Sequence, residues 1–236
     1  MRGPRASVSD PLVSVVMPVF NERGTIEEII RRVLSVPLRV QLIVVDDCST
    51  DGTRPLLVDL QRQHGFTLLL QDQNRGKGAA LRRGFQDITG DLVLVQDADL
   101  EYSPEDYPQL IELICQGRAD VVYGSRFLGR HRVFLFTHYL GNWVLTLLTN
   151  VLYNTMLTDM ETCYKVMRTD VLRSFTLRSS GFGIEPEMTA KIFKRKYRVY
   201  EVPITYDGRG YDEGKKITWR DGVVALWVLL KYRFTE

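Results

Sequence analysis

The sequence has too few cysteines for a disulfide framework or a cysteine-ligated metal site. Its three cysteines, Cys48, Cys115 and Cys163, stand far apart and match no metal-ligand spacing. Chains of this kind keep their thiols reduced, so we expect a reducing compartment, and the cytoplasm in particular.

An excess of charge of one sign is also missing. The 31 Lys and Arg residues nearly balance the 29 Asp and Glu residues, which leaves a formal net charge of +2. Nucleic-acid binding needs a strong positive field, so a balance this even argues against a nucleic-acid partner.

Long apolar runs are scarce. The first eleven residues, MRGPRASVSDP, are polar and contain no apolar stretch, so we expect a flexible N-terminus at residues 1–11 and no signal peptide. Residues 133–158 lack Asp, Glu, Lys and Arg and are long enough to span a bilayer, but four polar side chains interrupt them: His138, Asn142, Asn150 and Asn154. Such groups are costly in a lipid core, so we expect no membrane span.

Two interpretations of this uncharged segment remain open. It is either a buried core helix or a helix at a membrane surface. The second interpretation rests on Tyr139, Trp143 and Tyr153, because amphipathic aromatic rings suit the membrane interface.

What the sequence does contain is a regular alternation of apolar strands and amphipathic helices. Strands are expected at residues 13–20, 41–47, 66–73, 91–99 and 119–127, with helical patterns at 25–36, 53–65, 77–88 and 103–117. Continuous apolar strands between helices predict an α/β fold with a mostly parallel sheet and helices on both faces. We find no internal repeat or linker, which favours one domain over residues 12–236.

Acidic residues gather after the strand LVLVQ. Asp97, Asp99 and Glu101 stand at alternate positions, so an extended chain places them on one face, where they repel unless a cation lies among them. Mg²⁺ typically binds one or two carboxylates together with substrate phosphates. The alternative is a solvated turn before the next helix, and Glu101 is either a third ligand or only part of that turn.

Two earlier strands end in the same way. Asp46 and Asp47 follow LIVV, and Pro18, Phe20 and Glu22 close the first strand. The carboxyl ends of parallel strands form the ligand-binding edge of such sheets. A carboxylate there can accept hydrogen bonds from a nucleobase or a ribose, and Pro18 and Phe20 offer an apolar wall for a planar ring.

Four motifs in this order, VSVVMPVFNE, IVVDDCSTDGT, NRGKGAALRRGF and LVLVQDADLEYSPED, resemble the nucleotide-sugar half of family 2 glycosyltransferases of the GT-A fold. Beyond them, YGSRF, DMETCYKVMR, GFGIEPEMTAK and VPITYDGRGYDEGKK resemble the dolichyl- and polyprenyl-phosphate sugar synthases of that family. The resemblance covers residues 12–235. It implies a nucleotide-sugar half at about 12–128 and an acceptor half at about 129–236, with amphipathic C-terminal helices.

The resemblance also implies roles for individual residues. A metal ion, Mg²⁺ or Mn²⁺, would be held by Asp97, Asp99 and Glu101. The nucleotide-sugar would be bound by Pro18, Phe20, Glu22, Asp47, Asn74, Lys77 and Asp97, with Gly76 allowing close backbone approach. The acceptor phosphate would be bound by Arg126, Arg130, Arg209 and Lys215, and the residues expected at the reaction itself are Asp99, Arg126 and Arg209.

The acceptor is expected to be polyprenyl or dolichyl phosphate. A phosphate monoester is already anionic near neutral pH and needs positioning rather than a general base. We therefore interpret Glu187 as structural and Asp159 as a support, and expect inverting transfer of a hexose from a nucleotide-sugar, with UDP-hexose favoured and GDP-mannose open. The rival hypotheses are transfer to a glycan or small-molecule hydroxyl with Glu187 as base, and a nucleotide-sugar binding module without catalysis.

The same resemblance implies a place at the membrane. The helices at residues 133–158 and 222–234 would rest on the cytoplasmic membrane face, which makes the protein a peripheral one. A membrane-protein partner or a homo-oligomer would strengthen that attachment.

Overall fold

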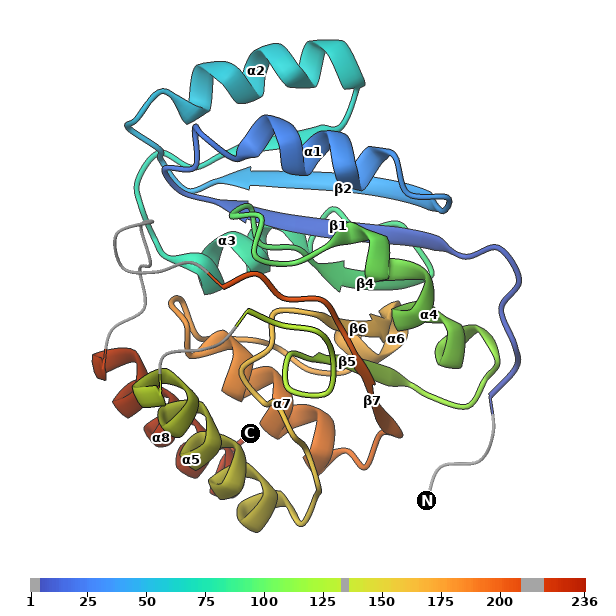
Figure 1. Ribbon diagram of the computed structural model, residues 1–236, viewed down its shortest axis with the longest axis vertical. Helices are drawn as coiled ribbons and strands as arrows, with labels where there is room; N and C mark the ends of the chain where they lie inside the picture. The colour runs from blue at the N-terminus through green and yellow to red at the C-terminus, as the bar shows by residue number, and fades with distance from the viewer. Residues whose placement is uncertain (1–4, 133–135, 209–218) are drawn as a thin grey trace.

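The computed structural model of the protein describes residues 5–132, 136–208 and 219–236 (Figure 1). These residues form one seven-stranded sheet with helices packed against it. The strands are β1 (Leu12–Val19), β2 (Arg39–Asp46), β3 (Thr67–Leu70), β4 (Leu92–Val95), β5 (Val121–Ser125), β6 (Lys165–Arg168) and β7 (Val199–Pro203).

The order of strands across the sheet is β3-β2-β1-β4-β6-β5-β7. All neighbouring pairs are parallel except those of β6, which runs antiparallel to both β4 and β5. The predicted α/β class with a mostly parallel sheet is confirmed. The apolar pattern did not indicate the reversal of β6, because a strand buried on both faces has the same composition in either direction.

The reversal of β6 decides which loops meet. Tyr123, near the end of β5, pairs with Lys165, the first residue of β6, and Leu94 near the end of β4 pairs with Val166. The segment that leads into β6 therefore lies at the edge where β4 and β5 finish. That edge is the one at which the sequence places its acidic residues.

The helices are α1 (Ile26–Leu34), α2 (Thr53–His64), α3 (Lys77–Gly84), α4 (Tyr107–Cys115), α5 (Phe136–Tyr153), α6 (Thr169–Arg173), α7 (Ile184–Lys194) and α8 (Trp219–Phe234), with a short 3₁₀ turn, η1 (Pro104–Asp106). In Figure 1, α1 and α2 lie at one end of the molecule and α5, α7 and α8 at the other. The central strands are fully buried, as Val15, Ile43 and Leu94 show with 0% exposure. Each such side chain stabilises the fold by about 1.5–3 kcal/mol, so the sheet is a rigid base for the loops at its edge.

Helix α5 turns its polar side inward. Asn142, Thr146 and Asn150, spaced four residues apart, share one face of the helix and form hydrogen bonds with residues 157–160. Leu145, Leu148 and Leu152 pack against the core, but much of its apolar surface points outward, with Trp143 at 49% and Val151 at 71% exposure. The interpretation of α5 as a buried core helix is therefore wrong.

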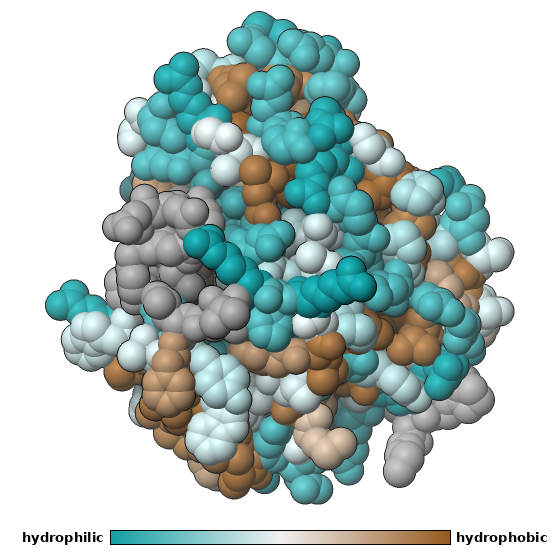
Figure 2. All heavy atoms as spheres, viewed as in Figure 1, coloured by the Kyte–Doolittle hydropathy of each residue, from teal (hydrophilic) through white to brown (hydrophobic). Residues whose placement is uncertain are grey.

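Helix α8 lies beside α5 and extends the apolar surface. Trp219, Trp227 and Phe234 are largely exposed on it, and Figure 2 shows apolar residues gathered at this end of the molecule. Among the described residues, no helix combines the length and the apolar character needed to cross a bilayer.

Candidate active site

The tips of three neighbouring strands and the start of α3 meet at the carboxyl edge of the sheet. Lys77, the first residue of α3, contacts Asp97, which follows β4: its Nζ lies 2.8 Å from Oδ1 and 3.0 Å from Oδ2. Burial alone would lower the pKa of Lys77, but the nearby carboxylate of Asp97 outweighs it and holds the pKa well above its usual value. Lys77 is therefore a fixed positive charge at this edge.

A second carboxylate reaches Lys77 from α7. Glu185 Oε1 lies 3.4 Å from Lys77 Nζ, and Glu185 Oε2 lies 2.7 Å from Lys165 Nζ. The side chain of Lys165 is completely buried. The two carboxylates and the two ammonium groups alternate, so each buried charge has a partner of opposite sign. Sequence analysis missed Glu185 as a site residue, because its position two residues before Glu187 gives no signal without the fold.

Glu187 faces a different environment. Its carboxylate accepts hydrogen bonds from the backbone N–H groups of Arg178 and Ser179, at 2.9 and 2.7 Å, and from Lys191 Nζ at 2.5 Å. Burial raises its pKa, but these donors outweigh burial and lower it overall. The carboxylate is fully engaged in holding the turn before α7, which agrees with its structural interpretation.

Asp47 organises the loop that leads into α3. Its carboxylate accepts hydrogen bonds from Gln71 Nε2 at 2.8 Å and from the backbone N–H groups of Arg75 and Gly76 at 2.8 and 2.7 Å. Gly76 has φ +88°, and a Cβ there would lie 2.7 Å from Ser180 O. Only glycine fits that conformation and that approach, so the loop has one geometry. The neighbouring Asp46 is likewise engaged, through Arg54 Nε at 2.6 Å.

The other residues expected at the nucleotide lie along the same edge. Pro18 pairs in register with Val45 near the end of β1, and the next loop is fixed by the Asn21 N–H donating to Ser49 Oγ at 2.9 Å. Glu22 is 8% exposed and accepts a hydrogen bond from Thr25 Oγ1. Phe20 is half-buried and Asn74 is exposed. These positions are compatible with the predicted nucleotide pocket, which stays a prediction.

The three expected metal ligands are not gathered around one point. Asp99 Oδ1 accepts a hydrogen bond from the Glu101 N–H at 3.2 Å, whereas Glu101 Oε2 accepts one from Tyr206 Oη at 2.5 Å. Over the described ranges, no cluster of three or more metal-ligating side chains is present. The hard carboxylate oxygens of Asp97 and Asp99 still suit Mg²⁺ or Mn²⁺ when substrate phosphates complete the ligand set. The structure thus gives Glu101 a contact with Tyr206 instead of a place beside Asp97.

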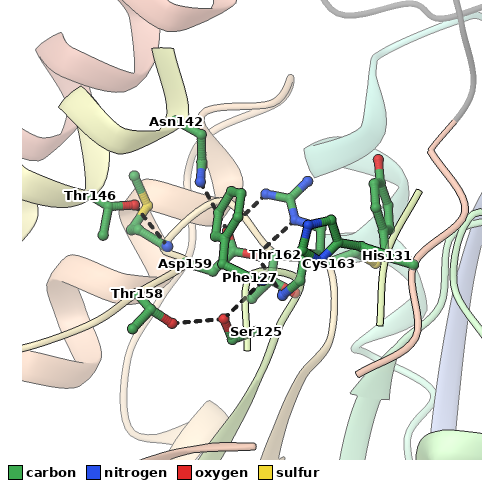
Figure 3. Close-up of polar contacts among 12 residues, drawn as sticks. Ser125, Phe127, His131, Asn142, Thr146, Thr158, Asp159, Thr162 and Cys163 are labelled. Carbon is green, nitrogen blue, oxygen red and sulfur yellow. Dashed lines mark hydrogen bonds and ion pairs between the residues drawn. The ribbon is translucent and has the colours of Figure 1, made fainter. Parts of the chain in front are cut away.

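Asp159, labelled in Figure 3, holds the side chain of Arg126, which directly follows β5. Asp159 is completely buried, and its carboxylate accepts hydrogen bonds from Arg126 Nε at 2.7 Å, Nη2 at 2.8 Å and the backbone N–H at 3.1 Å. Arg126 also lies over the ring of Tyr206, 5.2 Å from its centroid. Burial would lower the pKa of Arg126, but Asp159 raises it further above its usual value. The guanidinium is charged at every pH at which the protein is folded.

The remaining basic residues differ in their placement. Arg130 and Arg132 are exposed on the segment after β5. Arg209 and Lys215 lie outside the described residues.

Glu161 is a further buried carboxyl group that sequence analysis missed. Its Oε1 is buried and accepts no hydrogen bond within the part of the chain that the structure describes. Burial raises its pKa to about 7, a shift that Lys165 partly offsets. It lies in the same segment as Asp159, between the Lys165–Glu185 pair and Arg126.

Comparison with known proteins identifies the family of the chain. Residues 14–175 match the sequence model of the family described as glycosyl transferase family 2. A dolichol-phosphate mannosyltransferase from Pyrococcus furiosus is 31% identical over 86% of this chain and 58% of its own length. The low-salt glycan biosynthesis hexosyltransferase Agl6 from Haloferax volcanii is 30% identical over 84% of this chain and 48% of its own length. The chain thus spans about half the length of these curated relatives.

Solved structures share the fold. Glucosyl-3-phosphoglycerate synthase from Mycobacterium tuberculosis, in complex with Mn²⁺, UDP and phosphoglyceric acid, superposes with a TM-score of 0.74 at 23% identity, over 95% of this chain and 79% of that one. The same enzyme in complex with Mg²⁺ and UDP gives a TM-score of 0.73 at 24% identity, over 94% and 79% of the two chains.

Proposed function

Because the chain belongs to glycosyltransferase family 2, we propose that it transfers a hexose from a nucleotide-sugar to the phosphate of a polyprenyl or dolichyl phosphate. The observation that carries the acceptor is the buried pair of Arg126 and Asp159. A guanidinium fixed in one orientation and always charged is suited to a phosphate monoester. The dolichol-phosphate relative supports the same acceptor class.

The nucleotide-sugar donor would be bound by other residues at the same carboxyl edge of the sheet. Lys77 and the backbone around Gly76 stand where a diphosphate would lie, and the loop geometry imposed by Asp47 gives the chain a close approach to it. Asp97 and Asp99 would hold Mg²⁺ or Mn²⁺ there, and the cation would supply positive charge to the diphosphate as it departs. We propose a UDP-hexose donor, since similar folds bind UDP with these metals, and GDP-mannose is the alternative to be tested.

The chemical step is a single displacement. An oxygen of the lipid phosphate forms a bond to the anomeric carbon, and the bond from that carbon to the diphosphate oxygen breaks, which inverts the configuration. The products are the lipid-phosphate hexose and the nucleoside diphosphate. Near neutral pH the acceptor oxygen carries no proton that must be removed, so no general base is needed and Glu187 can remain engaged with Lys191.

The membrane contact belongs to α5 and α8. Their outward faces carry aromatic and aliphatic residues, and the last turn of α8 adds Lys231 and Arg233, which would face anionic lipid headgroups. A contiguous group of exposed apolar residues on two adjacent helices is typical of an interaction site. We propose that these helices lie on the cytoplasmic membrane face and present the lipid phosphate to Arg126.

An assay with defined components tests the proposal. Purified protein is incubated with Mn²⁺ or Mg²⁺, a panel of UDP- and GDP-sugars and a polyprenyl phosphate in detergent or vesicles. We expect metal-dependent release of one nucleoside diphosphate together with a new glycolipid. Release that occurs only with a sugar-alcohol or glycan acceptor would support the hydroxyl-transfer hypothesis. Donor binding without release under any condition would support the non-catalytic module.

A further inference from the structure

The polar face of α5 is joined to the segment that carries Asp159. Asn150 Oδ1 accepts a hydrogen bond from the Leu157 N–H, and its Nδ2 donates to Leu157 O, both at 2.8 Å. Thr146 Oγ1 accepts one from the Met160 N–H at 3.2 Å. Asn142 Nδ2 donates to Asp159 Oδ1 at 3.3 Å. Three residues on successive turns of α5 thus contact the segment 157–160. The contact made by Asn142 ends on a carboxylate.

The Asn142 contact is the one that reaches the proposed site. Asp159 Oδ1 accepts hydrogen bonds from both Asn142 Nδ2 and Arg126 Nη2, so one oxygen is shared by α5 and the guanidinium. Asn142 Oδ1 is buried and has no donor within the described ranges. The amide is therefore placed for its donor alone, and that donor points to Asp159 (Figure 3).

A second contact joins α5 to the same turn. The ring of Tyr139 meets the ring of Phe127 edge to face, with centroids 5.6 Å apart, and Phe127 directly follows Arg126. Helix α5 consequently reaches the Arg126–Asp159 pair from two positions almost one helical turn apart, with Tyr139 against the residue after Arg126 and Asn142 on Asp159. Both contacts come from a helix whose opposite side is apolar and exposed.

We propose that Asn142 is a positioning residue, which fixes the orientation of the Arg126 guanidinium through Asp159 and so makes acceptor binding depend on where α5 is seated. This inference rests on the proposed function, because it concerns the same acceptor phosphate. Without the amide, Asp159 keeps its charge pair with Arg126 but loses the α5 donor among the hydrogen bonds that orient its carboxylate. The orientation of Arg126 depends on that carboxylate, since its Nε and Nη2 both donate hydrogen bonds to Asp159.

A pair of variants separates positioning from mere stability. Asn142→Leu removes the donor and keeps the approximate size of the side chain. Asn150→Ala removes two hydrogen bonds from the same face of the same helix and has no contact with Asp159. We expect Asn142→Leu to raise KM for a polyprenyl phosphate about tenfold, the range for loss of a hydrogen bond to a charged group, with kcat and the KM for the donor changed less than twofold. Asn150→Ala is expected to lower Tm and leave the acceptor KM within twofold of wild type.

A measurement independent of turnover completes the test. The ¹⁵Nε–¹H resonance of Arg126, assigned by its absence in Arg126→Lys, should shift or broaden in Asn142→Leu and remain unchanged in Asn150→Ala. Asn142→Gln, which keeps an amide donor, should restore part of the wild-type signal. An unchanged Arg126 resonance in Asn142→Leu, or equal changes in both variants, overturns the inference. Absence of transfer by the wild-type protein with an altered Arg126 resonance would instead overturn the proposed function alone.

Discussion

Lys77 Nζ lies 2.8 Å from Asp97 Oδ1, so the first residue of α3 is tied to the tip of β4. This pair joins the phosphate-side loop to the acidic strand end before any ligand is bound. A bound metal ion would interact with the negative charge of Asp97, and a diphosphate with the positive charge of Lys77, so both would weaken the pair.

Asp97→Asn tests that carboxylate. The amide keeps the shape of the side chain but removes the charge that would hold a divalent cation, so we expect transfer activity to fall by about 10²–10³-fold. The stabilisation of the protein by UDP plus Mn²⁺ in a thermal-shift assay should be lost as well. Asp59→Asn is the matched control, because Asp59 is exposed on α2 and pairs with the equally exposed Arg62. Equal behaviour of the two variants would contradict the assignment.

The Arg126–Asp159 pair has an internal control in the same protein. Asp120 is also completely buried and forms a two-pronged pair with Arg198, at 3.2 Å to both Nε and Nη2. Asp159→Asn removes the buried counter-charge of Arg126, and Asp120→Asn removes that of Arg198 and of Arg5, whose Nε lies 2.9 Å from Asp120 Oδ1. Both variants should lower the free energy of unfolding, by up to about 3–5 kcal/mol. Denaturant titration measures this loss.

Only one of these two variants should affect the acceptor. We expect Asp159→Asn to raise the KM for polyprenyl phosphate by at least about tenfold, and Asp120→Asn to leave it unchanged in folded protein. An equal rise in both variants would show that Arg126 acts through overall stability.

Glu161 should give the stability of the protein a pH dependence. Its folded-state pKa of about 7 stands above the usual value of 4.5, so between these values the folded protein binds more protons than the unfolded chain. The free energy of unfolding then decreases as the pH rises through this window, by at most about 1.4 kcal/mol per pH unit. Glu161→Gln should make the free energy of unfolding, measured by urea titration at pH values from about 5 to about 7, less dependent on pH. A slope unchanged by the substitution would remove Glu161 as its source.

Glu187→Gln separates the lipid-phosphate hypothesis from transfer to a hydroxyl. The amide cannot accept the full set of hydrogen bonds from Lys191, Arg178 and Ser179, so we expect a lower Tm. Because the Glu187 carboxylate is already engaged by Lys191 and by the backbone N–H groups of residues 178 and 179, the pH profile of kcat should keep its shape. Glu185→Gln, which removes the charge beside Lys77 and Lys165, is expected to change kcat more strongly. Loss of the acidic limb of the pH–activity profile in Glu187→Gln alone would restore the general-base hypothesis, because a general base is active only when deprotonated.

The membrane surface can be tested by charge. Trp143→Glu and Trp227→Glu place carboxylates on the exposed sides of α5 and α8, and we expect each to reduce co-sedimentation with anionic vesicles at least about tenfold. Leu34→Glu on α1 is the control, since Leu34 is 38% exposed at the other end of the molecule. Vesicle binding that all three variants weaken equally would assign the contact to net charge.

The fold was predictable wherever the chain repeats one local pattern. Strands β1 to β5 and the helices between them follow directly from apolar runs and helical spacing. Sequence also indicated that the acidic residues share an edge, because parallel strands finish together. Neither the reversed β6 nor the pairing of Glu185 with Lys77 has such a local signal, since both depend on contacts between residues that lie far apart along the chain.

The same limit applies to α5. The four polar residues in an uncharged segment argued against a membrane span, and the structure shows the positive reason for two of them: Asn142 and Asn150 bind residues 157–160. Composition cannot reveal which side of a helix faces the protein. The average hydropathy of a helix is the same whichever of its sides faces the protein.

The position of β6 also bears on how the chain folds. β4 and β5 are synthesised well before β6, yet they are separated in the finished sheet by the width of that strand. Until β6 arrives, each of them presents an unpaired edge that another strand could occupy. Both partners of β5 in the sheet, β6 and β7, follow α5 in the chain, so the sheet cannot be completed until α5 has been synthesised. During synthesis the open edges of β4 and β5 and the exposed apolar side of α5 are therefore present together, and both must be kept from aggregating.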